Sequence, residues 1–326
     1  MKIMAVENDP FILELLPLLA AKSGFPDVTL FSSSVQALHE LSYGTDPFDC
    51  LLLDINMPVM TGIELCTRVR QVQAYRKTPI IMLTAMSERE FMDAAFQAGA
   101  TDYVTKPFDI SELGARLRVA RELVTAWREA RLVRQTHAAA SAQQQHAFAL
   151  SEAVDLDGAA GLVEFSALQN YLKQISRAGR AASQIIAVKV DRIAGIYDRA
   201  TSQEFTYALG EVAGAITEML RGSGVLVSYV GTGVFVVVSN MPHVLIPAEV
   251  ESAVQQILDD KNAEYDSGAP LDIEVSIGNP IQLGSSGAAD VSVAVDRAIA
   301  RAECRCQTKR NQPALVNICP RTARQG

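Results

Sequence analysis

One apolar run, residues 50–53, constrains the fold of this chain more than any other feature. It reads Cys50-Leu51-Leu52-Leu53 and ends at Asp54. A short, continuous apolar run of this kind is typical of a buried strand. Such a strand would deliver the Asp54 carboxylate to its C-terminal edge, where the ligand sites of open α/β sheets lie.

Two further polar side chains fit the same geometry. Thr84 ends the apolar run 79–83, and Lys106 follows residues 103–105 and precedes Pro107. A carboxylate, a hydroxyl and an ammonium at three strand ends would form a site for a charged tetrahedral group on Asp54. The alternative is that Asp54 is an ordinary loop carboxylate.

Strand-like and helix-like segments alternate from residue 1 to about residue 125. The expected strands are residues 3–6, 28–31, 50–53, 80–83 and 102–104. This alternation predicts an α/β domain with a five-stranded parallel sheet flanked by helices.

The D-x-x-M-P motif at Asp54, the Thr-Ala pair at Thr84 and the Lys-Pro pair at Lys106 resemble the receiver domain of two-component response regulators. The resemblance implies that Asp54 is the phosphoacceptor. It implies that the Thr84 hydroxyl and the Lys106 ammonium bind the phosphoryl oxygens, and that Tyr103 changes rotamer together with Thr84.

The same resemblance implies a Mg²⁺ site formed by Glu7, Asn8, Asp54 and Asn56. Receivers usually carry two acidic residues after the first strand, whereas here Asn8 fills the second position. A neutral amide adds no charge to a cation that prefers carboxylates and waters. We therefore expect weak Mg²⁺ binding that still permits phosphorylation, with Asp9 capping the next helix.

The last receiver helix begins near Asp109 and shows no stop signal, so a linker helix over residues 126–154 is expected to continue it to about Leu150. Apolar residues recur along it at heptad-like spacing, which favours a partner helix. These residues are Leu113, Leu117, Ala120, Val124 and Trp127. The alternative is that Leu113 and Leu117 pack on the receiver sheet. Six arginines (116, 118, 121, 128, 131 and 134) predict a solvated basic face.

Residues 155–320 are expected to form a second α/β domain around a mostly antiparallel sheet, followed by a frayed tail over residues 321–326. Its expected strands are residues 185–190, 225–230, 234–238, 273–277 and 315–318, and its expected helices are residues 164–178, 204–220, 247–258 and 290–304. The turn Gly231-Thr232-Gly233 predicts a hairpin between the second and third of these strands.

The order of these elements, the segment 157–162 and the triplet Ser276-Ile277-Gly278 resemble the GGDEF domain of diguanylate cyclases. The residues that this family uses for catalysis are mostly replaced. The resemblance places Lys189 at the metal-binding Asp, Ala194 at the phosphate-binding Lys, Tyr197 and Thr206 at two guanine contacts, Thr232 and Gly233 at the acidic pair of the signature hairpin, and Glu303 at the triphosphate-binding Lys.

These replacements reverse the charge that a metal–GTP complex requires, since Lys189 is a cation and Glu303 is an anion. We expect no cyclase activity and a catalytically inactive, degenerate GGDEF-like domain. The product-inhibition motif R-x-x-D is reduced to Arg221 alone, because residue 224 is glycine. This domain would then serve as an interaction or dimerisation module.

Composition narrows the remaining choices. A chain of 326 residues suggests about two domains, and a net charge of −8 gives no general affinity for nucleic acid. Five scattered cysteines, an N-terminus that enters a strand directly and no long apolar run predict a cytoplasmic protein without a membrane span. Cys304 and Cys306 lack a second ligand pair and are not expected to bind metal.

The leading hypothesis is a bacterial response regulator that a histidine kinase or phosphotransfer protein phosphorylates on Asp54. The long helix would pass the signal to the second domain, which would bind a second copy of the chain or a downstream protein. Three alternatives remain open: a non-catalytic sensor of GTP or cyclic-di-GMP, an active cyclase, and a DNA-binding regulator, for which no helix-turn-helix segment is apparent.

Overall fold

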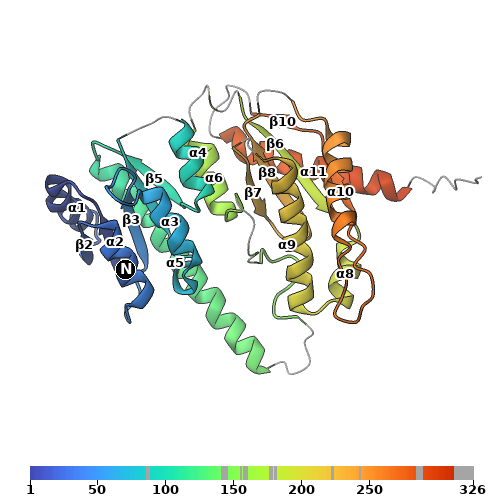
Figure 1. Cartoon of the computed structure of the whole chain (residues 1–326), viewed down its shortest axis with the longest axis horizontal. Helices are drawn as coiled ribbons and strands as arrows, with labels where there is room; N and C mark the ends of the chain where they lie inside the picture. The colour runs from blue at the N-terminus through green and yellow to red at the C-terminus, as the bar shows by residue number, and fades with distance from the viewer. Residues whose placement is uncertain are drawn as a thin grey trace, which may run out of the picture.

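The computed structural model describes residues 1–85, 89–140, 146–154, 156, 161–175, 179, 182–221, 224–241, 244–283 and 289–311 (Figure 1). The predicted strand 315–318, the tail 321–326, most of the segment 157–162 and two positions of the motif at Arg221 lie outside these residues, as do the side chains of Arg131 and Arg134.

The N-terminal part is built on a parallel sheet with the strand order β2-β1-β3-β4-β5 (Figure 1). The strands are β1 (Ile3–Val6), β2 (Val28–Phe31), β3 (Cys50–Asp54), β4 (Ile80–Thr84) and β5 (Asp102–Thr105). All five predicted strands are confirmed, and the last three are one residue longer than predicted. Strands β1, β3 and β4 are buried along their whole length, as expected for a sheet with helices on both faces.

Helices cover both faces of this sheet. The helices are α1 (Pro10–Lys22), α2 (Ser34–Tyr43), α3 (Gly62–Gln71), α4 (Arg89–Gln97) and α5 (Ile110–Ala140), with a short 3-10 helix at Gln73–Tyr75. One apolar core joins the sheet to α1 and α5, and another joins it to α2, α3 and α4. The predicted cap is confirmed, because Asp9 accepts hydrogen bonds from the Phe11 and Ile12 amides at the start of α1.

The C-terminal part has its own sheet of antiparallel strand pairs, in the order β10-β6-β8-β7 with β9 also paired to β6. The strands are β6 (Gln184–Val190), β7 (Leu226–Tyr229), β8 (Val234–Ser239), β9 (Val275–Ile277) and β10 (Ile281–Gln282). The helices are α6 (Phe165–Gln174), α8 (Ile193–Arg199), α9 (Ser202–Met219), α10 (Pro247–Lys261) and α11 (Ala289–Asn311).

The two faces of the second sheet carry different helices. Residues of α8, α9 and α10 pack on one face, and residues of α6 and α11 pack on the other. The predicted hairpin is confirmed, because β7 and β8 pair across the turn at Gly231–Gly233. The fold is therefore α/β throughout, with one parallel and one mostly antiparallel sheet (Figure 1).

The linker is the clearest departure from the sequence-based expectation. Helix α5 ends at Ala140 within the described residues, and residues 146–150 are not helical, so the helix predicted to reach Leu150 is wrong there. Phe148 and Leu150 instead pack against the core of the second domain, and the Tyr197 hydroxyl donates a hydrogen bond to the Phe148 carbonyl oxygen (2.6 Å). Burying these apolar side chains against the second domain stabilises a non-helical path over a helical one.

The heptad-like seam on α5 also resolves differently from the partner-helix hypothesis. Leu113, Leu117 and Ala120 are buried in the receiver core, which confirms for the first two the alternative that they pack on the sheet. Val124 is buried as well, and Trp127 is half-buried. Leu113, Leu117 and Ala120 therefore hold α5 to its own domain, while the partner helix expected at Trp127 stays a prediction.

Several predicted boundaries shift by a few residues. Helix α6 ends at Gln174 rather than residue 178, because the chain leaves helical geometry at Ile175, whose side chain is buried in the core. Strand β9 begins at Val275 rather than residue 273, and α10 and α11 extend beyond their predicted ends. No helix among the described residues is long and apolar enough to cross a membrane.

Candidate functional site

Four polar side chains meet at the carboxyl edge of the parallel sheet. Asp54 ends β3, Thr84 ends β4, Glu7 follows β1 and Lys106 follows β5. The register places Asp54 opposite Leu83 and Thr84 opposite Thr105, so the neighbouring strands end together. The structure thus brings together the strand-end residues that the sequence singled out.

The centre of this site is a buried ion cluster. The Lys106 ammonium lies 2.6 Å from Glu7 Oε2 and 2.6 Å from Asp54 Oδ1. Glu7, Asp54 and Thr84 are each at most 3% exposed. Burial alone lowers the pKa of Lys106, but its hydrogen bonds to Asp54 and Glu7 outweigh this and raise the pKa above its usual value.

Local structure holds the carboxylates in place. Glu7 Oε1 accepts hydrogen bonds from the Asn8 and Asp9 amides, both at 3.1 Å, which fixes the turn after β1. The Lys106 amide donates to the Thr84 carbonyl oxygen (2.7 Å), so β5 carries Lys106 directly beside β4. The Lys106–Pro107 peptide bond is cis.

The segment after Asp54 brings the start of α3 close to the site, and this close approach requires a glycine at position 62. A Cβ atom at Gly62 would lie 2.0 Å from the Asp54 carbonyl oxygen, so only glycine allows α3 to start this close to the site. Helix α3 begins with a capping box between Thr61 and Glu64.

The expected magnesium ligands are hard oxygen donors at one edge of the sheet. Glu7 and Asp54 supply carboxylates, while Asn8 and Asn56 are exposed residues beside them. Among the described residues, no group of three or more His, Cys, Asp or Glu side chains is arranged to hold a metal ion. The Glu7 and Asp54 carboxylates and the two amide oxygens are ligand types that Mg²⁺ accepts, but the site has one acidic residue fewer than receivers usually have.

Tyr103, the expected switch aromatic, lies half-buried on the outer side of β5. Its ring meets Phe96 of α4 edge-on, with centroids 6.4 Å apart, and its hydroxyl donates to the Gln174 carbonyl oxygen of α6 (3.4 Å). Tyr103 therefore contacts the second domain, a contact that the sequence did not reveal.

The residues that the cyclase resemblance singled out, here called the degenerate cyclase positions, lie in three places on the second domain. The Lys189 ammonium, on β6, donates a hydrogen bond to the Thr232 carbonyl oxygen in the β7–β8 turn. Gly233 in this turn has a left-handed backbone conformation (φ 73°). Burial lowers the pKa of Lys189, and the Glu303 carboxylate of α11 acts against this shift. Ala194 is exposed on α8, and Tyr197 and Thr206 lie on α8 and α9.

The linker covers two of these positions. The His146 ring stacks on Tyr197 with centroids 3.7 Å apart, and Phe148 contacts Tyr197 and Phe205. The Thr232 amide donates to the Leu150 carbonyl oxygen (2.8 Å). The spacing of aromatic residues in the sequence did not indicate this aromatic cluster, because His146 lies in a stretch rich in alanine and glutamine.

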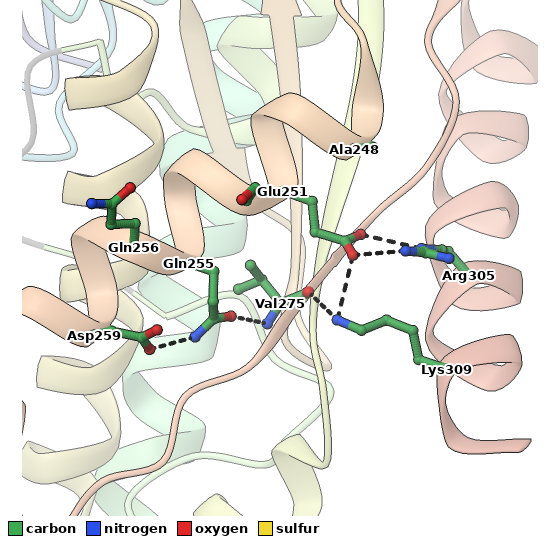
Figure 2. A pocket seen from close by; sticks show the side chains of 9 residues that line it. Ala248, Glu251, Gln255, Gln256, Asp259, Val275, Arg305 and Lys309 are labelled. Atoms are coloured by element: carbon green, nitrogen blue, oxygen red, sulfur yellow. Dashed lines mark hydrogen bonds and ion pairs between the residues drawn. The ribbon is translucent and has the colours of Figure 1, made fainter. Parts of the chain in front are cut away.

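A hollow of about 410 Å³ lies elsewhere on the second domain, between α10, β9 and α11 (Figure 2). Figure 2 shows its charged groups turned toward one another: Glu251 pairs with Arg305 (3.0 Å) and with Lys309 (3.5 Å). Lys309 also donates to the Val275 carbonyl oxygen (2.8 Å). These contacts tie α11 to the sheet, and the residues lining the hollow are not those at the degenerate cyclase positions.

Comparisons with known proteins match the N-terminal part of the chain. The family described as the response regulator receiver domain matches residues 3–118. The transcriptional regulatory protein KdpE of Staphylococcus aureus is 33% identical over 132 residues, which is 40% of this chain and 54% of KdpE. The DNA-binding dual master transcriptional regulator RpaA of Synechocystis is 32% identical over 117 residues, or 36% of this chain and 47% of RpaA. The chain thus spans about half the length of these curated relatives.

Solved structures are also similar to part of the chain. The chemotaxis protein CheY4 of Vibrio cholerae is 31% identical, with a TM-score of 0.34, covering 36% of this chain and 97% of CheY4. The receiver domain of a sensor histidine kinase from Pseudomonas aeruginosa, described with magnesium in its active site cleft, is 28% identical, with a TM-score of 0.34, covering 38% of this chain and 97% of that domain. The five-stranded parallel sheet, the Asp54 cluster at its carboxyl edge and the family match agree, and residues 3–118 are a two-component response regulator receiver domain.

Proposed function

We propose that the whole chain is a response regulator that is phosphorylated on Asp54 and passes this signal to its C-terminal domain. The observation that carries the proposal is the Lys106 ammonium, held 2.6 Å from both Asp54 and Glu7. A group that already neutralises the Asp54 carboxylate is positioned to neutralise a phosphoryl group bound to it.

In the proposed reaction, an oxygen of Asp54 attacks the phosphorus of a phosphohistidine on a histidine kinase or phosphotransfer protein. The new bond joins Asp54 oxygen to phosphorus, and the phosphorus–nitrogen bond breaks, returning the electron pair to the histidine. Lys106 pairs with the phosphoryl oxygens, and the Thr84 hydroxyl donates a hydrogen bond to one of them. A Mg²⁺ ion held by Glu7, Asp54, Asn8 and Asn56 would supply further charge neutralisation.

The C-terminal domain is proposed to be an interaction module without catalytic activity. Lys189 supports this proposal, because its ammonium is hydrogen-bonded to the Thr232 carbonyl oxygen at the position where the cyclase resemblance expects a metal-binding carboxylate. A cation fixed at that point repels a divalent metal ion. The proposed partners are a second copy of the chain and a downstream protein.

Asp54→Asn tests the phosphorylation step. We expect the full chain, incubated with Mg²⁺ and acetyl phosphate, to gain one phosphoryl group by intact-mass spectrometry, and Asp54→Asn to gain none. Asp46→Asn is the matched control, because Asp46 pairs with Lys2 on the surface and should leave phosphorylation unchanged. Equal labelling of Asp54→Asn and the wild type would refute the proposed phosphoacceptor.

A further inference from the structure

Helix α6 of the second domain lies against α4 and β5 of the receiver (Figure 1). Met92 and Phe96 of α4 belong to the same apolar cluster as Leu168, Tyr171 and Leu172 of α6. The Phe96 and Tyr171 rings meet edge-on with centroids 5.3 Å apart, and both side chains are fully buried. The two domains therefore share a continuous apolar core at this point.

A carboxylate of the receiver is bound by two side chains of the second domain. Asp93 of α4 accepts a hydrogen bond from the Tyr171 hydroxyl (2.7 Å) at one oxygen and from the Asn240 amide (3.0 Å) at the other. Asn240 also donates to the Tyr171 hydroxyl oxygen (2.8 Å), and its own oxygen accepts from Ser183 (2.7 Å). Hydrogen bonds to a charged group contribute more than neutral ones, so this triad holds α4 to the second domain.

A second set of contacts joins α6 to β5. The Gln174 side-chain amide donates to Asp102, and the Asn170 amide donates to the Thr101 carbonyl oxygen (3.2 Å). The Tyr103 hydroxyl donates to the Gln174 carbonyl oxygen (3.4 Å). Tyr103, the side chain expected to respond to phosphorylation, is thus hydrogen-bonded to α6.

We propose that α6 is an intramolecular latch that covers α4 and β5 of the unphosphorylated receiver and leaves them when Asp54 is phosphorylated. This proposal rests on the proposed function. If Thr84 turns toward the phosphoryl group and Tyr103 follows it inward, the bond from Tyr103 to Gln174 is lost and the ring leaves the edge of Phe96. The signal then reaches the second domain directly through α6, not only through α5.

The latch should also act from α6 back on the phosphorylation site. If α6 binds the unphosphorylated arrangement better, thermodynamic linkage requires that α6 weakens the binding of a phosphoryl group or its mimic. Loosening α6 should therefore strengthen the response at Asp54, although α6 does not touch the phosphorylation site. A second copy of the chain could bind the surface of α4 and β5 only after α6 has left it.

Beryllofluoride mimics the phosphoryl group and is added with Mg²⁺ to the full chain. It tests both whether modification of Asp54 releases α6 and whether α6 weakens binding at Asp54. Tyr171→Phe removes the hydroxyl that Asp93 and Asn240 share and keeps the buried ring. Gln174→Ala, a second variant at the half-buried end of α6, keeps the experiment interpretable if Tyr171→Phe does not fold. We expect each variant to bind beryllofluoride about tenfold more tightly by calorimetry, equivalent to about 1.4 kcal/mol.

Matched controls make the same chemical changes outside the interface. Tyr229→Phe alters a buried tyrosine whose hydroxyl accepts from the Gly233 amide, and Lys173→Ala alters an exposed residue of α6. Both should bind beryllofluoride as the wild type does. In wild type, beryllofluoride should also raise hydrogen–deuterium exchange over residues 165–174, and Asp54→Asn should show no such rise.

The outcomes separate the two proposals. Beryllofluoride binding without increased exchange in α6, together with equal affinities for Tyr171→Phe and Tyr229→Phe, would overturn the latch and leave the phosphoacceptor intact. If wild type binds no beryllofluoride, the proposed function fails at Asp54 and the latch fails with it.

Discussion

At the scale of single residues, Lys106 decides the chemistry of the receiver site. Its single positive charge pairs with two buried carboxylates, Glu7 after β1 and Asp54 at the end of β3, which would otherwise repel each other. A buried charge that loses its partner is costly, because the remaining ions keep their desolvation penalty. The same side chain that would bind a phosphoryl group therefore also stabilises the unphosphorylated protein.

Replacing Lys106 with methionine should reveal this structural role. We expect Lys106→Met to lower the free energy of unfolding by about 3 kcal/mol in urea titrations, since both carboxylates lose their cation. Mg²⁺ should restore part of the loss in the variant, because it can occupy the same negative site. Lys22→Met, at an exposed lysine of α1, should have no measurable effect.

The pH dependence of this loss follows from the raised pKa of Lys106. A lysine whose folded-state pKa lies above its ordinary 10.5 contributes its full stabilisation below that pH and loses it only as the pH rises further. The difference between wild type and Lys106→Met should thus be the same at about pH 7 and about pH 9. A difference that shrinks over this range would contradict the ion cluster.

Asn8 allows a specific prediction about Mg²⁺ affinity. Asn8→Asp adds the missing acidic residue beside Glu7 at the edge of the sheet and should tighten Mg²⁺ binding about tenfold in calorimetry. Asn279→Asp makes the same change at an exposed position of the second domain and is the control. Equal Mg²⁺ affinity in Asn8→Asp and wild type would show that Asn8 lies outside the metal site.

At the scale of elements, the sequence predicted correctly those strands that are buried along their whole length. The runs at β1, β3 and β4 are apolar up to their ends, so these strands and the positions of Asp54 and Thr84 followed from the apolar pattern, whereas Glu7 followed from the receiver resemblance. The two-residue strand β10 carries too short a pattern to be recognised. The linker was predicted as helix because the sequence shows no stop signal there, whereas the packing of Phe148 on the second domain holds residues 146–150 outside a helix.

Phe148→Ala tests that account of the linker. We expect a loss of about 2 kcal/mol in the unfolding free energy of the C-terminal domain, below the range for a fully buried phenylalanine because Phe148 is only half-buried. Tyr43→Ala, at a side chain that is 77% exposed, should change stability little. Similar effects from both substitutions would mean that residues 146–150 do not hold the linker to the second domain.

At the scale of the whole molecule, the contacts of α6 were beyond prediction from the sequence. Tyr171 has the spacing of an ordinary core residue between Leu168 and Leu172, and nothing in that spacing shows that its hydroxyl binds Asp93, which is 78 residues away. The same holds for Asn240, which contacts the receiver only because the two sheets lie on either side of α6. A sequence pattern shows which side of a helix or strand is buried. It does not show which surface of the other domain that side packs against, because this depends on the folded shapes of both domains.

The second domain provides a last prediction about the molecule as a whole. Incubated with GTP and Mg²⁺, the chain should form no cyclic-di-GMP detectable by chromatography, with or without beryllofluoride. One reversed charge, such as Lys189 where the cyclase resemblance expects a metal-binding carboxylate, is worth about 4 kcal/mol at a separation near 4 Å and an effective dielectric of 20. Lys189→Asp should not restore activity either, because Glu303 still repels the triphosphate and His146 still stacks on Tyr197. Product from the wild-type chain would refute the inactive module, and heat from GTP binding without product would favour a nucleotide sensor.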